Sequence, residues 1–176
     1  MNIFYLDHDP SIAAAYHCDK HVVKMILESA QMLSTAHWVG EAQASGITDL
    51  KKLKTRVKLS SNAPVGIYAP THVSHPSSIW TRSSTANYDW LASLAKELCL
   101  EYTRRYGRKH KTQDLIERLI VSRPSGLSTA PFVEPPQCMP DHCKVQGDSV
   151  SAYRKYYMSE KRKFAKWKTQ TPHWWI

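Results

Sequence analysis

The fold of this chain is decided by the stretch HCDKHVVKMILESAQMLST, residues 17–35. Its apolar side chains recur at helical spacing and form a face wide enough to pack into a core: Val22, Val23, Ile26, Leu27, Ala30 and Leu33. Its polar side chains stack along one narrow line of the same helix: His17, His21, Lys24, Glu28, Gln31 and Thr35. This line predicts either the wall of a site or the solvent-exposed edge of an amphipathic helix.

The length of 176 residues and the hydrophobic share of 42% predict one globular domain, residues 1–176, with its own core. No stretch approaches the length of a membrane span, so we expect no membrane partner. The N-terminus has neither a basic lead nor a long apolar run, which argues against a signal peptide. The expected location is a cytoplasm, that of the host if the protein is viral. No sequence pattern indicates an oligomeric state.

The chain is strongly basic, with 24 Lys and Arg against 15 Asp and Glu and a formal net charge of +9. Such an excess favours a polyanionic partner, nucleic acid first, over a basic protein without one. The excess gathers in three clusters: Lys51, Lys52, Lys54, Arg56 and Lys58; Arg104, Arg105, Arg108, Lys109 and Lys111; and Arg154, Lys155, Lys161, Arg162, Lys163, Lys166 and Lys168.

Capping and breaking residues predict where the first helix begins and ends. Asp9 is a good N-cap and Pro10 a good first helical residue, so we expect a helix over residues 10–38 that Gly40 ends. Turn-forming residues and the first basic cluster predict a long loop or insertion, with at most one short helix, over residues 40–70.

Three further segments complete the expected architecture. Residues 84–106 predict a long helix that Gly107 ends, and Thr112 caps a third helix. Residues 123–147 hold five of the ten prolines and predict an ordered loop, and residues 148–168 predict a basic C-terminal helix. No convincing strand pattern occurs, so the expected fold is all-α, a compact single-domain helical bundle with long loops.

Glu28 is the single carboxylate of the polar line and the first candidate for a general acid or base. It lies beside apolar Leu27 and one turn from Lys24. The alternative is an ordinary i,i+4 ion pair between Lys24 and Glu28, which stabilises a helix by a few tenths of a kcal/mol.

The four cysteines do not indicate a disulfide framework in a chain of this length and expected location. His17 and His21 have the spacing at which two imidazoles share a metal ion, and the segment CMPDHC, residues 138–143, offers further ligands. Its spacing matches no common zinc pattern, so we expect no metal and no cofactor. A histidine pair that binds a phosphate or a base is the preferred interpretation.

Other histidines and rings extend the candidate site. His72 and His75 precede Pro76, and the alternative for His75 is a turn that orients Trp80. Aromatic residues alternate with basic ones toward both ends of the chain, a pattern that permits stacking on unpaired or flipped bases, although most rings are expected in the core.

The order of these residues resembles small phage and bacterial proteins of the pyrimidine-dimer DNA glycosylase family, distant relatives of the phage endonuclease V fold. The matching residues are Met1-Asn2-Ile3-Phe4, Lys24, Glu28, Gln31, His75-Pro76, Trp80, and Glu101 with Arg105, within the first 110 residues or so. The resemblance implies a compact all-α fold and a catalytic glutamate at Glu28. It also implies attack of the N-terminal amine, here that of Met1, on the anomeric carbon of a sugar, an iminium intermediate and strand cleavage.

The chain departs from the family at two positions. The family enzyme exposes a small Thr after loss of its initiator Met, whereas Asn2 is large enough to predict that Met1 is retained. The arginine expected beside the catalytic glutamate is replaced by Leu27.

The predicted function is that of a phage-type DNA-acting enzyme with base-excision chemistry, a DNA glycosylase and AP lyase, on damaged or modified bases. Its predicted catalytic residues are Glu28 and Met1. The predicted substrate-binding residues are His17, His21, Lys24, Gln31, His72, His75, Trp80, Arg82 and Arg105. Two alternatives remain: binding or degradation of a small anionic nucleotide, as in sequestration of a defence signal, and a metal-dependent phosphohydrolase that uses His17, His21 and residues 138–143.

Overall fold

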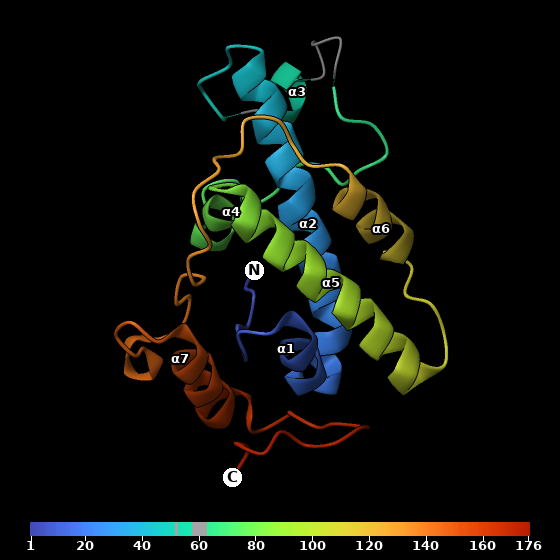
Figure 1. Cartoon of the computed structure of the whole chain (residues 1–176), viewed down its shortest axis with the longest axis vertical. Coiled ribbons are helices and arrows are strands. Elements are labelled where there is room, and N and C mark those ends of the chain that lie inside the picture. The colour runs from blue at the N-terminus through green and yellow to red at the C-terminus, as the bar shows by residue number, and fades with distance from the viewer. Residues whose placement is uncertain (52, 58–62) are drawn as a thin grey trace.

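The computed structural model describes residues 1–51, 53–57 and 63–176 and confirms the all-α fold (Figure 1). Within these residues the one β-bridge, between Ser84 and Ser128, is isolated. No helix in the described ranges has both the length and the apolar composition needed to cross a bilayer. The elements are α1 (Pro10–Tyr16), α2 (Asp19–Ala44), α3 (Leu53–Val57), α4 (Pro76–Thr81), α5 (Thr85–Tyr106), α6 (Gln113–Val121), η1 (Asp141–Cys143), α7 (Ser149–Tyr156) and η2 (Tyr157–Lys161).

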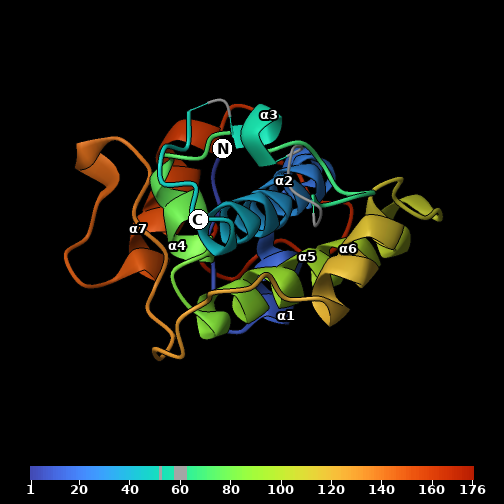
Figure 2. The ribbon, with the colours of Figure 1, turned by 90° about the horizontal axis from the view of Figure 1, so that it is seen from above.

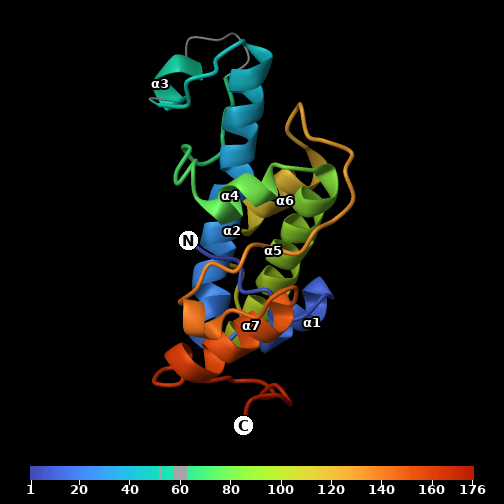
Figure 3. The ribbon, with the colours of Figure 1, turned by 90° about the vertical axis from the view of Figure 1, so that its left-hand side faces the viewer.

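The two longest helices, α2 and α5, pack against each other through the body of the molecule, with α6 and α7 on opposite sides (Figures 1 and 2). The helix α3 lies at one end and the C-terminus at the other (Figures 1 and 3). Apolar side chains from the N-terminal segment, α1, α2, α5, α6 and α7 form the main core. The N-terminus lies beside the middle of α2, and in Figure 3 it reaches the edge of the ribbon (Figures 1 and 3).

The prediction of a single helix over residues 10–38 is wrong in two respects: the helix is broken near its start, and it does not end before Gly40. The chain leaves the helical conformation at His17, with ψ 131°, and at Cys18, with ψ 160°, so α1 and α2 are separate. The helix α2 also continues through Gly40. A Cβ atom at this position would lie only 2.7 Å from the carbonyl oxygen of Ser125, which explains why the residue is glycine. Gly40 therefore admits a crossing loop and does not end the helix.

Most of the predicted polar line faces other chain segments. The interpretation of this line as the solvent-exposed edge of an amphipathic helix is therefore wrong for most of its residues. His17, His21, Glu28 and Thr35 are buried, and only Lys24 extends into solvent. The apolar face is narrower than predicted, because Val23 and Leu27 are each 40% exposed.

The other predicted segments are confirmed in part. The helices predicted over 84–106 and from Thr112 match α5 and α6, and Gly107 ends α5 with φ 65°. The interval 40–70 contains the last turn of α2 and the short α3, while residues 52 and 58–62, with Lys52 and Lys58 of the first basic cluster, lie outside the described residues. The interval 123–147 is a loop, as predicted, with η1 near its end. The helix predicted over 148–168 is shorter: α7 stops at Tyr156, and a π-helical turn follows.

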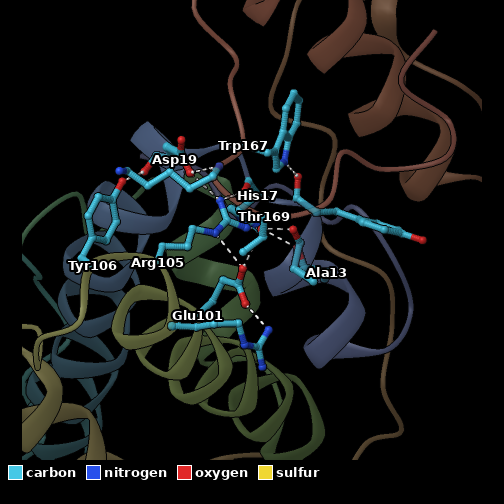
Figure 4. A network of polar contacts seen from close by, with 12 residues as sticks. Ala13, His17, Asp19, Glu101, Arg105, Tyr106, Trp167 and Thr169 are labelled. Atoms are coloured by element: carbon cyan, nitrogen blue, oxygen red, sulfur yellow. Dashed lines mark hydrogen bonds and ion pairs between the residues drawn. The ribbon is translucent and has the colours of Figure 1, made fainter.

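A buried guanidinium joins α5 to the turn between α1 and α2 (Figure 4). The side chain of Arg105 is fully buried and donates to the carbonyl oxygens of Ala15 (3.0 Å) and His17 (2.8 Å). It also donates to Asp19 Oδ1 (2.9 Å) and to Glu101 Oε1 (2.7 Å). The charge and the hydrogen-bonding groups of Arg105 are therefore committed to the fold, and this residue does not line the cavity described below.

The same network holds the C-terminal segment. Thr169 donates to Glu101 Oε1 (3.2 Å), and the backbone N–H of Lys168 donates to Asp19 Oδ1 (3.1 Å). The indole of Trp167 donates to the carbonyl oxygen of Tyr16 (3.0 Å). The last ten residues thus pack across the turn between α1 and α2.

We expect Arg105→Ala to lower the free energy of unfolding by about 3–5 kcal/mol, because it removes the buried partner of Glu101 and Asp19 and leaves the carbonyl oxygens of Ala15 and His17 without their donor. Arg104→Ala is the matched control, since Arg104 pairs with the same Glu101 from a side chain that is 65% exposed. It should cost less than about 1 kcal/mol. Urea unfolding measures both values, and equal losses would contradict a structural role for Arg105.

The burial of His17 predicts a pH-dependent stability. Its Nδ1 donates to the carbonyl oxygen of Ala13 (2.7 Å), and burial lowers its pKa from 6.5 to about 4, with a smaller effect from the charge of Arg105. Between these pH values the unfolded chain binds more protons than the folded chain. The stabilisation is therefore complete above about pH 6.5 and is lost as the pH falls toward 4.

From His17 alone the free energy of unfolding should fall by roughly 2 kcal/mol between pH 7 and pH 5. Urea midpoints across this range measure the slope. His17→Gln should reduce the slope and leave the part that His21 contributes, whereas His8→Gln, at an exposed histidine, is the control that keeps the full slope. An equal slope in wild type and His17→Gln would contradict the assignment.

Candidate functional site

The N-terminal segment is tied down by Asn2, which contacts two distant parts of the chain. Asn2 Nδ2 donates to the carbonyl oxygen of Cys138 (2.9 Å) in the proline-rich loop. Asn2 Oδ1 accepts from the hydroxyl of Tyr153 on α7 (2.7 Å) and from the N–H of Ile3 (2.8 Å). These bonds hold the start of the chain against α2.

Glu28 meets the start of the chain at this point. The backbone N–H of Asn2 donates to Glu28 Oε2 (3.0 Å), and the α-amine of Met1 lies 3.9 Å from the same oxygen. The other oxygen, Oε1, lies 3.1 Å from Lys24 Nζ. The carboxylate is 12% exposed and therefore lies at the edge of the protein interior, beside the two amines. The predicted catalytic pair, Glu28 and Met1, is brought together.

A cavity of about 480 Å³ opens over this pair. Its lining combines three lysines, several rings and a single carboxylate, that of Glu28. The lining residues are Met1, Asn2, Phe4, Lys20, His21, Lys24, Glu28, Cys138, Tyr156, Lys161 and Phe164. A concave site with a surplus of positive charge concentrates anions.

The aromatic side of the cavity centres on Phe4. The Phe4 ring stacks on His21, with centroids 4.2 Å apart and an interplanar angle of 21°, and lies nearly parallel to Tyr156 at 6.0 Å. Phe4 has φ 55°, a left-handed conformation that a bulky residue rarely adopts and that costs about 1–3 kcal/mol. The surrounding contacts must offset this strain to hold the ring in place.

Two of the lysines lie over these rings. Lys161 Nζ is 4.1 Å from the centroid of Tyr156, and Lys20 Nζ is 5.0 Å from that of Phe164. In such a pair the ammonium group is available to a phosphate, and the aromatic ring is available to stack on a base.

His21 lines the cavity as a neutral ring. Its Nδ1 lies 2.5 Å from the hydroxyl of Tyr157, and burial lowers its pKa to about 3, with smaller contributions from the charges of His17, Lys161 and Lys24. At neutral pH it supplies a flat surface and no positive charge. His17 belongs to the core and does not line the cavity.

The histidines before α4 do not line the cavity, although His75 lies near enough to the N-terminal amine for the charge of the amine to affect it. His75 caps α4 by accepting from the N–H of Ser77 (3.1 Å). Burial lowers the pKa of His75, as do the charges of the N-terminal amine and His72, while Glu28 opposes them. His72 is exposed, with φ 48°, and bonds the hydroxyl of Thr71. Gln31 is half-buried and lies outside the lining.

Two predicted binding residues lie elsewhere. Trp80 is buried, donates to the carbonyl oxygen of Val133 (2.8 Å) and packs beside Phe132, in agreement with the alternative interpretation of His75-Pro76 as a turn that orients it. Arg82 lines a separate depression of about 200 Å³ next to Gly40, and burial lowers its pKa.

Sequence patterns did not identify Lys20, Phe4 or Phe164 as site residues, although all three line the cavity. Lys20 lies outside the polar line, and the two rings come from opposite ends of the chain. Tyr156 and Lys161 belong to the C-terminal segment in which aromatic residues alternate with basic ones, and that pattern did predict contacts with nucleic acid. Of the three basic clusters, the third reaches the cavity through Lys161.

The metal alternative combined His17 and His21 with residues 138–143, and within the part of the chain that it describes the structure does not group these histidines with ligands from that segment. Over residues 1–51, 53–57 and 63–176, the one group of three potential ligand residues is His142, Cys143 and Glu160, which includes neither histidine of α2.

Comparisons of this chain with protein-family models, with curated proteins and with solved structures find no match.

Proposed function

We propose that the chain is a DNA-acting enzyme that removes a damaged or modified base by DNA glycosylase and AP-lyase chemistry. One observation carries the proposal: the α-amine of Met1 lies 3.9 Å from Glu28 within a lysine-lined cavity. An amine nucleophile next to a carboxylate that exchanges protons with the substrate is the pair that this reaction class requires.

The first step replaces the base. The lone pair of the neutral amine forms a bond to C1′ of the sugar while the bond from C1′ to the base nitrogen breaks. The base leaves with that electron pair and takes up a proton from solvent, and the Met1 nitrogen, now bonded to C1′, releases one proton to the Glu28 carboxylate. Opening of the sugar ring then gives an iminium between the Met1 nitrogen and C1′, and O4′ of the sugar takes a proton that Glu28 is placed to deliver.

The second step cleaves the strand. The Glu28 carboxylate removes a proton from C2′, the electrons move toward the iminium, and the bond from C3′ to oxygen breaks. The 3′ phosphate leaves, and water hydrolyses the remaining imine to free the amine. Lys24, at 3.1 Å from Glu28, stabilises the ionised carboxylate between the steps.

The remaining lining supplies binding. Lys20 and Lys161 offer positive charge to phosphates, which dominate affinity for DNA. Tyr156 offers a flat face to an unpaired base, and the buried ring of Phe4, stacked on neutral His21, lies nearly parallel to it.

A small anionic nucleotide is the second candidate ligand. The observation that favours it is the grouping of three lysines with several rings around a cavity of about 480 Å³, a volume within the range of small-molecule sites. The two candidates differ in salt dependence, because a duplex engages more phosphates than a free nucleotide.

The first prediction concerns the amine. Incubation with end-labelled duplexes that carry a thymine dimer, an abasic site or neither, in the presence of borohydride, should trap a covalent complex on a lesion duplex. Peptide mapping should place the sugar on Met1, and the N-terminal mass should be determined in the same sample. Trapping on Lys24 would move the nucleophile, and absence of both trapping and cleavage would overturn the proposal.

The second prediction concerns Glu28. Glu28→Gln retains an acceptor for the N–H of Asn2 but cannot exchange a proton, so strand cleavage should fall about 10²–10⁴-fold with DNA affinity preserved. Glu117→Gln is the control, because it makes the same change at an exposed residue of α6, and it should keep full activity. Unchanged turnover in Glu28→Gln would remove Glu28 from the mechanism.

The third prediction concerns the lysines. Lys20→Met and Lys161→Met should each weaken duplex binding and reduce the slope of log K against log salt by about 0.9 per lost phosphate contact. Lys155→Met is the control, because Lys155 is exposed and does not line the cavity. Fluorescence anisotropy between low and moderate salt measures the slopes. Equal slopes in all three variants would place the DNA elsewhere, and loss of free-nucleotide binding alone would favour the second candidate.

A further inference from the structure

Two short irregular turns meet beside the cavity. One is the 3₁₀ turn η1 at the end of the proline-rich loop, and the other is the π-helical turn η2 after α7. Single π turns within helices often mark functional sites. Here the two turns bring together His142, Cys143 and Glu160, whose donor atoms all lie within 4.8 Å of one another.

The three side chains approach from different sides. His142 Nε2 lies 3.0 Å from Glu160 Oε1, and both side chains are exposed. Cys143 is fully buried, and its Sγ lies 3.2 Å from the hydroxyl of Ser159. The thiol thus faces the cluster from the protein interior, while the imidazole and carboxylate face it from solvent, which leaves an entry path for an ion.

We propose that His142, Cys143 and Glu160 bind a Zn²⁺ ion. A thiolate, an imidazole and a carboxylate are the three ligand types that zinc takes in proteins, whereas magnesium and calcium prefer oxygen alone. Binding releases the Cys143 proton to solvent, and the ion with one thiolate and one carboxylate carries no net charge. Three protein ligands leave the fourth tetrahedral position to water.

The ion would join the proline-rich loop to the C-terminal turn. Each of these segments supplies lining residues to the cavity, Cys138 from the loop and Lys161 from the turn. Zinc would therefore hold one wall of the cavity in place. The inference does not depend on the proposed DNA chemistry, because it rests on the ligand cluster alone.

An exposed ion pair between His142 and Glu160 is the competing explanation, and the chain contains a matched control for it. His8 pairs with Glu134 at 3.6 Å, also near the surface, and within the described residues this pair belongs to no group of three potential metal ligands. His8→Ala therefore removes a similar ion pair without touching the cluster.

The experiment uses the full chain, stripped with chelator and then titrated with Zn²⁺ or Co²⁺. We expect about one Zn²⁺ per chain after dialysis, a rise in thermal stability with zinc, and in the Co²⁺ form a thiolate-to-metal absorption band. Cys143→Ser should abolish the band. His142→Ala and Glu160→Gln should weaken zinc binding at least about tenfold and remove the thermal shift.

His8→Ala should bind zinc as the wild type does. Substoichiometric zinc in the wild type, or a Co²⁺ spectrum without the thiolate band, would overturn the proposal. Equal zinc affinity in Glu160→Gln, an exposed change with little risk to folding, would do the same. Each readout is independent of DNA cleavage, so failure of the enzyme proposal would leave these outcomes unaffected.

Discussion

The buried guanidinium of Arg105 is the interaction on which the arrangement of the helices depends. It donates hydrogen bonds to backbone carbonyl oxygens that the break between α1 and α2 leaves without helical partners. Its positive charge is balanced by Glu101 and Asp19. A buried charge of this kind is tolerated only when its donors are satisfied. Because the network includes the ends of α1 and α5 and the start of α2, it sets where α2 begins.

The position of α2 in turn decides what the polar line can do. With the helix starting at Asp19, His21 packs under Phe4, Lys24 projects to solvent, and Glu28 meets the start of the chain. The N-terminal segment lies across α2 because Asn2 is bonded to both the proline-rich loop and α7. The carboxylate and the amine are therefore neighbours through tertiary contacts made by segments that are far apart in the sequence.

The cavity walls differ in the kind of element that forms them. The floor consists of α2 and the bonded N-terminal segment, whereas the opposite wall consists of a loop and a short π-helical turn. Loops placed on a rigid scaffold commonly carry binding residues, and their conformation is the part most open to control by a ligand or an ion. A zinc ion between His142 and Glu160 would act on this wall and leave the floor unchanged.

The sequence by itself determined the helical class and the ends of α5, because apolar spacing and Gly107 are local signals. It also drew attention to Glu28, which lines the cavity, since a single carboxylate in a narrow polar line stands out without any structure. The tertiary structure decided the rest: Gly40 lies inside a helix, Arg105 and His17 are structural, and Lys20, Phe4 and Phe164 line the cavity. The physical reason is that helix periodicity depends on near neighbours in the chain, whereas burial, close backbone approach and the convergence of side chains depend on contacts between distant segments.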